Sequence, residues 1–247
     1  MTTAQRPPSV DSPARAKAKS TIYRLAAVAF GHPLPETQQA FADGSFNQAL
    51  DSAWQAVTGR PWPCQPASSS FAELEAGYIS AFRHGRQGRP QVALVAGEYE
   101  ELLDGQMRPT FLLNVQAFYK HFGLKAAVGD EGLTEEPDHL SAMLEFMAVL
   151  THLEAQALAA GKEPTSYRLA QRDFLKRHLV PLLATIQRQV ASEKRLTLDA
   201  TLVRLIEDLP EWARNQLVEL EARVGPYDEK VKGAAIKGRA LDQNLWN

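Results

Sequence analysis

The stretch from Pro137 to about Gly161 constrains the fold of this chain more than any other segment. It combines a proline suited to the first turn of a helix with apolar residues that recur every three or four positions. Phe146 and Val149 fall on a second face, so apolar side chains cover much of the circumference. The pattern predicts a central helix surrounded by other helices. Its main apolar stripe consists of Leu140, Met143, Leu144, Met147, Leu150 and Leu153.

Helical spacing recurs along most of the remaining chain, whereas alternating apolar and polar runs are almost absent. The one short candidate strand, Val92 to Val95, has no partner run, so a loop or a helical turn is expected there. Pro181 is expected to bend one helix, and Pro210 to separate the last two. The sequence therefore predicts an all-α, single-domain helical bundle. The expected helices cover residues 14–30, 36–42, 46–57, 70–85, 109–123, 137–161, 164–186, 199–209 and 211–222.

The two ends of the chain differ in composition from this helical region. Residues 1–13 contain three prolines among polar residues, so a disordered N-terminal tail is expected. Residues 224–247 contain little apolar surface and form an expected loosely ordered C-terminal tail. The predicted helical domain is thus 14–223.

Composition and charge exclude several classes of protein. The formal net charge is −2 and no long basic run occurs, so no nucleic-acid partner is expected. No stretch approaches the roughly 20 apolar residues that a membrane span needs. Cys64 is the only cysteine, which rules out an internal disulfide and fits a reducing compartment. These features predict a cytoplasmic protein.

The common signatures of enzymes and metal sites are missing. The sequence has no phosphate-binding loop, dinucleotide fingerprint or nucleophile elbow, so neither a cofactor nor a catalytic residue is expected. His139 and His152 are separated by about 20 Å along one helix, too far to share a metal ion. One enzymatic alternative uses Asp138, His139 and Glu145 as acid and base. Because adjacent helical residues point about 100° apart, Asp138 and His139 make a poor dyad.

A strongly acidic stretch precedes the central helix. Its simplest interpretation is a solvated loop whose carboxylates favour the positive end of the helix dipole. An acidic rim beside an apolar face would also suit a peptide that carries arginines next to a hydrophobic segment. Composition alone favours the solvated loop. The acidic residues are Asp130, Glu131, Glu135, Glu136 and Asp138.

The run EEPDHLSAMLEFMAVL, residues 135–150, resembles the Pro-Asp-His signature of the TorD/DmsD/NarJ-like redox-enzyme maturation chaperones. Three further segments resemble that family in the same order. They are the opening helix at residues 23–33, FYKHFGL at 118–124 and FLKRHLVPLL at 174–183. The resemblance spans residues 22–186, most of the chain.

This resemblance implies a cytoplasmic chaperone that binds the apo catalytic subunit of a molybdopterin-containing oxidoreductase, including its twin-arginine leader. The chaperone would hold that subunit while the molybdenum cofactor is inserted before export. Substitution of both Asp138 and His139 by Ala is then expected to weaken client binding with little effect on stability. A general helical adaptor is the remaining alternative. The implied client-binding residues are Glu135, Glu136, Pro137, Asp138, His139 and Met143, with the apolar face of Leu140, Leu144 and Met147 as the groove for the leader.

Overall fold

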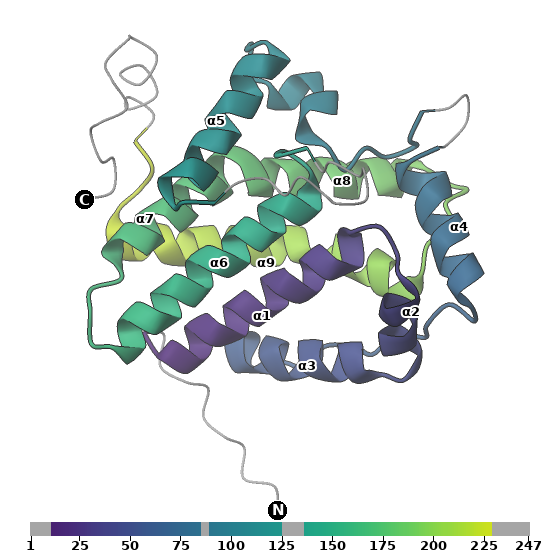
Figure 1. Cartoon of the computed structure of the whole chain (residues 1–247), viewed down its shortest axis with the longest axis horizontal. Helices are drawn as coiled ribbons and strands as arrows, with labels where there is room; N and C mark the ends of the chain where they lie inside the picture. Colours follow the sequence, from purple (N-terminus) through teal and green to yellow (C-terminus); the bar gives the residue numbers. More distant parts are fainter. Residues whose placement is uncertain (1–10, 85–88, 125–135, 229–247) are drawn as a thin grey trace, which may run out of the picture.

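Two helices lie side by side at the centre of the computed structural model, which describes residues 11–84, 89–124 and 136–228. They are α1 (Pro13–Phe30) and α6 (Leu140–Ala159), and Figure 1 shows them running together through the middle of the molecule. Most of the buried positions of α1 are alanines, which allow the two helix axes to approach closely. The hydroxyl of Ser20 also donates a hydrogen bond of 2.8 Å to the carbonyl of Ala148.

The other helices surround this pair. Helix α3 (Ser45–Thr58) packs on α1, and α9 (Ala200–Val224) packs on α7 and α8. In Figure 1, α5 and α3 lie on opposite sides of the central pair, and α4 lies at one end. The remaining elements are α2 (Pro35–Ala42), α4 (Phe71–Phe82), η2 (Ala96–Glu98), η3 (Glu100–Leu102), α5 (Arg108–His121), α7 (Thr165–Phe174), the π-helical turn η4 (Leu175–Leu179) and α8 (Val180–Ser192).

The prediction of an all-α bundle around a central apolar helix is confirmed. The apolar residues of α6 form the middle of the core, and several of them have no exposed surface. No strand forms in the part of the chain that the structure describes, where Val95 and His139 make an isolated antiparallel bridge. Over the same residues, no helix combines the length and the apolar character that crossing a membrane requires. The fully buried residues of α6 are Leu140, Met143, Leu144, Met147 and Leu150.

Two proline-based predictions of helix boundaries were wrong. Helix α6 begins at Leu140, three residues after Pro137, because His139 is its N-cap and the backbone before it turns to meet another segment. Pro210 lies inside α9 and does not divide it. Proline inside a helix costs about 3 kcal/mol. The neighbouring side chains of Leu209 and Trp212 are buried, and the free energy gained from burying them offsets that cost.

The region around Pro181 departs from a single bent helix. The predicted helix 164–186 consists of α7, η4 and α8 in direct succession. The π-helical turn η4 contains the buried residue His178, whose ring packs among Phe111, Phe118 and Phe174. Pro181 lies within the first two positions of α8, where its missing N–H costs little.

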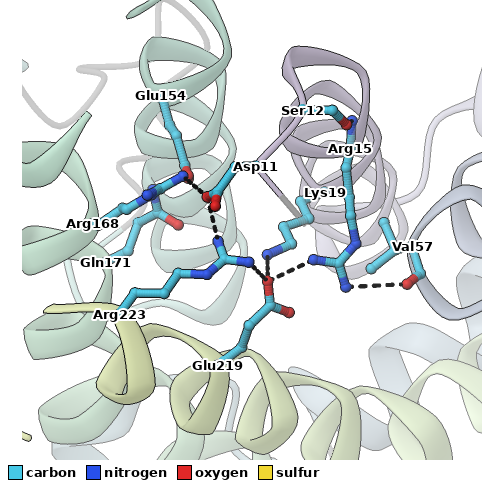
Figure 2. Close-up of polar contacts among 10 residues, drawn as sticks. All are labelled: Asp11, Ser12, Arg15, Lys19, Val57, Glu154, Arg168, Gln171, Glu219 and Arg223. Atoms are coloured by element: carbon cyan, nitrogen blue, oxygen red, sulfur yellow. Dashed lines mark hydrogen bonds and ion pairs between the residues drawn. The ribbon is translucent and has the colours of Figure 1, made fainter. Parts of the chain in front are cut away.

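Ionic contacts anchor the N-terminal end of α1 to α6, α7 and α9 (Figure 2). Glu219 accepts hydrogen bonds from Arg15 and Lys19 over 2.5 and 3.0 Å. Asp11 pairs with Arg168, which also pairs with Glu154. The folded region therefore starts before residue 14.

The expected boundaries of both tails need adjustment. The hydroxyl of Ser12 caps α1, and Pro13 is already helical. At the other end, Arg172 donates to the carbonyls of Gly225 and Pro226, so these residues pack on the bundle. Residues 1–10 and 229–247 of the predicted tails lie outside the described residues.

Candidate functional site

The turn that precedes α6 is joined by backbone hydrogen bonds to the segment that connects α4 to η2. The N–H of Ala96 donates to the carbonyl of Asp138 over 3.0 Å, and the N–H of Leu140 donates to the carbonyl of Leu94 over 2.8 Å. We call residues 136–139 the signature turn and residues 89–95 the connecting segment. Figure 1 shows the connecting segment passing between the end of α4 and the start of α6.

The carboxylate of Asp138 strengthens this attachment. Its Oδ2 accepts a hydrogen bond of 2.7 Å from the N–H of Gly97, and the whole residue is buried. Burial raises the pKa of Asp138, although the hydrogen bond from Gly97 opposes the increase. A Cβ atom on Gly97 would lie 2.9 Å from Oδ2 of Asp138 and 2.9 Å from Nε of Arg108. Only glycine therefore fits at position 97 in this arrangement.

His139 forms the N-cap of α6. Its Nδ1 accepts a hydrogen bond of 3.2 Å from the N–H of Ser141 and lies 2.7 Å from the hydroxyl of the same residue. An imidazole acceptor at this position replaces the hydroxyl or carboxylate that commonly caps a helix. The half-buried ring also lines the groove described below.

Helix α5 supports the signature turn from the other side. The hydroxyl of Tyr119 donates a hydrogen bond of 2.6 Å to the carbonyl of Pro137. In the first turn of the same helix, Arg108 forms ion pairs with Glu98 and Glu136. The guanidinium of Arg108 thus joins the acidic residue of the signature turn to η2.

An apolar groove of about 550 Å³ opens between the end of α4, the connecting segment and the N-cap of α6. Aliphatic and aromatic side chains form most of its wall, and histidines and charged residues lie along its margin. Glu98, which pairs with Arg108, is one of these marginal residues. The lining residues are His32, Ile79, Phe82, Arg83, His84, Pro90, Ala93, Leu94, Val95, Glu98 and His139.

The residues proposed from the sequence occupy different environments. Glu136 is exposed, and Pro137 and His139 are half-buried. Asp138 and Met143 are buried, so their side chains do not reach the surface. Glu135 lies outside the described residues, as do Asp130 and Glu131 of the acidic stretch.

The predicted apolar groove on α6 was wrong. Leu140, Met143, Leu144 and Met147 are fully buried, and α6 packs on α1 and α7. A helix that is apolar around most of its circumference belongs in a core, where each face finds a partner. The groove in the structure is formed by α4 and the connecting segment, with His139 as its contribution from the signature.

The acid–base alternative finds little geometric support. The Oδ2 of Asp138 is bonded to Gly97 inside the protein, and the Nδ1 of His139 faces Ser141. Glu145 is exposed on α6, whereas Asp138 is buried. Across the described ranges, no three His, Cys, Asp or Glu side chains are grouped in a way that could hold a metal ion.

Sequence reasoning missed the residues that hold the signature turn in place. Gly97 and Arg108 precede the turn by about 30 to 40 positions, and no periodicity links them to it. The wall residues Ile79 and Phe82 belong to the predicted helix 70–85, and their spacing did not mark them as the wall of a groove. A glycine in the connection between the predicted helices 70–85 and 109–123 was the available signal of a close backbone approach.

The all-helical fold and the Pro-Asp-His turn at the start of α6 define the class as the redox-enzyme maturation chaperones. The chain belongs to the nitrate reductase delta subunit family, which matches residues 38–186. The resemblance inferred from the sequence is therefore confirmed. No solved structure matches the chain.

Similar curated proteins carry names that refer to assembly. The chain is 49% identical to the dimethyl sulfide dehydrogenase assembly chaperone protein of Rhodovulum sulfidophilum over 96% of this chain and 95% of that protein. It is 32% identical to the perchlorate reductase assembly chaperone protein of Dechloromonas aromatica over 77% and 85% of the two chains. The selenate reductase assembly chaperone protein of Thauera selenatis is 35% identical over 56% of this chain and 67% of that protein. All three relatives are thus named as assembly chaperones.

Proposed function

We propose that this protein is a dedicated cytoplasmic chaperone for the apo catalytic subunit of a molybdopterin-containing oxidoreductase. It binds that subunit and its twin-arginine leader, and it holds them while the molybdenum cofactor is inserted before export. The relatives are named as assembly chaperones of a dehydrogenase, a perchlorate reductase and a selenate reductase. These names support an oxidoreductase as the client.

The groove beside the signature turn is the observation that carries the leader-binding part of the proposal. Its wall offers apolar surface for the hydrophobic segment of a leader, and a volume of about 550 Å³ is enough for several side chains. Exposed carboxylates at Glu98 and Glu136 lie next to it and would attract arginines. A peptide that carries arginines beside an apolar segment has complementary chemistry for both parts of this surface.

The same arrangement gives each signature residue a role. Asp138 joins the turn to η2 through Gly97, and the carbonyl of Pro137 joins the turn to Tyr119 of α5. Glu136 and His139 present side chains to the ligand. Met143 contributes to the core that supports the turn and does not contact the client.

A binding titration tests the proposal. The probe is a 20-residue synthetic peptide with two consecutive arginines followed by an apolar segment, and its affinity is measured by calorimetry. Ile79→Glu places a charge in the wall of the groove and is expected to weaken binding at least tenfold. Leu113→Glu is the matched control, because Leu113 is 65% exposed on α5 and does not line the groove. Equal affinities for the two variants would contradict the proposed site.

A further inference from the structure

Arg108 occupies a position that a ligand could take. Its guanidinium lies between the carboxylates of Glu98 and Glu136, at 2.8 Å from the first and in direct contact with the second. All three side chains are open to solvent, with exposures of 37% for Arg108, 50% for Glu98 and 48% for Glu136. An ion pair this exposed adds little to stability, on the order of 0 to 1 kcal/mol for each contact.

Backbone contacts fix the segments that carry the two carboxylates, independently of Arg108. The N–H of Glu98 donates to the carbonyl of Val95 over 3.2 Å, and the carbonyl of Glu136 accepts from the N–H of His139 over 2.9 Å. Asp138 and Gly97 join these two segments directly. The carboxylates are thus attached to a frame that remains when Arg108 is replaced.

The paired carboxylates adjoin the apolar groove, because Glu98 belongs to both. Two acidic groups that face one planar cation are well suited to a guanidinium, which can donate to both at once. A lysine ammonium is a more compact charge and bridges such a pair less well. The surface therefore favours a ligand that has arginine next to an apolar segment.

We propose that Glu98 and Glu136 form the binding site for an arginine of the client, and that Arg108 is an internal substitute which this arginine displaces. The inference rests on the proposed function, because it assigns the charged part of the same binding surface. When the client is absent, Arg108 keeps the two carboxylates paired. Binding exchanges one guanidinium for another, so a client that lacks arginine cannot displace Arg108 and gains only the apolar contacts.

The test compares three proteins and three peptides. The proteins are the native chain, R108Q and the double variant E98Q/E136Q. The peptides are the 20-residue arginine peptide defined above, a copy with both arginines replaced by lysines and a copy with both replaced by glutamines. R108Q is expected to bind the arginine peptide roughly tenfold more tightly, with a smaller gain for the lysine peptide and none for the glutamine peptide. E98Q/E136Q is expected to lose affinity for the arginine peptide alone.

Two controls separate this effect from simpler explanations. R204Q removes another partly exposed arginine that pairs with two acids, Glu207 and Asp208, away from the groove, and should leave all affinities unchanged. If R204Q tightens binding as much as R108Q, the effect is one of net charge and the proposal fails. R108K keeps the positive charge and the fold but loses the planar guanidinium that donates to both carboxylates. We expect its affinity for the arginine peptide to lie between those of the native chain and R108Q.

The outcomes also distinguish this inference from the proposed function. Suppose that the peptides bind the native chain, and that R108Q unfolds at the native temperature but binds the arginine peptide no more tightly. Arg108 then has only a structural role, and the inference is overturned. If R108Q unfolds at a lower temperature than the native chain, R108K is used in its place. Tighter binding of the arginine peptide by R108K supports the inference, and equal or weaker binding overturns it. If no peptide binds any of the proteins, leader binding at the groove and the inference both fail.

Discussion

The N–H of Gly97 donates a hydrogen bond of 2.7 Å to the buried carboxylate of Asp138, across 41 positions of sequence. This contact explains why the acidic residue of the signature belongs to the interior of the protein. It attaches the start of α6 to η2, which directly follows the connecting segment that supplies part of the groove wall. The effect of Asp138 on a ligand is therefore indirect, through the position of Val95 and His139.

Substitution of Gly97 by Ala should destabilise the fold. A Cβ at this position would lie 2.9 Å from Oδ2 of Asp138, so the backbone or the carboxylate has to move. We expect a loss of about 1 to 3 kcal/mol, measured by chemical denaturation. Gly31→Ala is the control, because a Cβ at position 31 would lie an ordinary 3.4 Å from the carbonyl oxygen of Val28 and the φ of Gly31 is −70°. Equal losses for the two variants would show that the close approach at Gly97 has no energetic importance.

Substitution of Asp138 by Ala should cost about 1 to 3 kcal/mol of stability, because it leaves the partly buried N–H of Gly97 without its charged acceptor. This corrects the expectation that alanine at both signature positions would affect binding alone. Asp138→Asn keeps an acceptor oxygen and does not titrate. A denaturation measurement that finds Asp138→Ala as stable as the native chain would contradict the role of this contact.

The same residue predicts a pH dependence. Burial raises the pKa of Asp138 in the folded state above its unfolded value of about 3.9. The folded state thus binds the proton more tightly, and this contribution is fully present below about pH 4 and is lost as the pH rises through the folded pKa. The stability of the native chain relative to Asp138→Asn should accordingly decrease as the pH rises from 4 toward neutrality. A difference that increases over that range would contradict the sign of the shift.

Glu219 should show the opposite dependence. Burial alone would raise its pKa, but the hydrogen bond from Arg15 and the charges of Lys19 and Arg15 outweigh burial and lower the pKa to about 2. Its contribution is present above the unfolded value of about 4.3 and is lost as the pH falls toward 2. At neutral pH, Glu219→Gln should cost about 2 to 4 kcal/mol, because the surrounding cations lose their common partner (Figure 2).

Denaturation of Glu219→Gln between pH 7 and pH 2 checks this prediction. The difference from the native chain should shrink across the window from about pH 4.3 to 2. Glu207→Gln is the control, since Glu207 is exposed and pairs only with Arg204 among the ion pairs of the described residues. A deficit of Glu219→Gln that persists unchanged at pH 2 would show that the charge of Glu219 does not hold this network together.

Substitution of Leu144 by Ala should destabilise the protein by about 2 to 5 kcal/mol, since its side chain is fully buried at the centre of the core. Leu113→Ala is the matched change on an exposed position and should fall within about 0.5 kcal/mol of the native chain. Thermal unfolding of the two variants checks both values. A negligible loss at Leu144 would contradict the central place of α6.

The helices could be predicted from the sequence because their signal is local. The predicted helix 70–85, for example, corresponds to α4, which Ser70 caps by accepting from the N–H of Glu73. The carboxylate of Glu73 in turn accepts hydrogen bonds from the N–H and the hydroxyl of Ser69, just before the cap. Errors at helix boundaries had tertiary causes: burial keeps α9 continuous through Pro210, and pairing with the connecting segment delays the start of α6.

The candidate site could be predicted only in part, because sequence pattern does not tell a core face from a binding face. The apolar stripe at Met143 looks the same in either role, and packing by α1 decides the matter. Likewise, the acidity of Asp138 gave no sign that its partner is the backbone of Gly97. Glu136 and His139, next to it in sequence, do reach the surface.

Site-specific photo-crosslinking tests the central claim most directly. A photoreactive residue at position 79, in the groove, is compared with one at position 113, outside it, in the presence of an apo molybdopterin oxidoreductase catalytic subunit with or without its leader. The account predicts a crosslink from position 79 that maps to the leader and disappears when the leader is removed, with little from position 113. Crosslinks that are equal at the two positions, or unchanged without the leader, would contradict it.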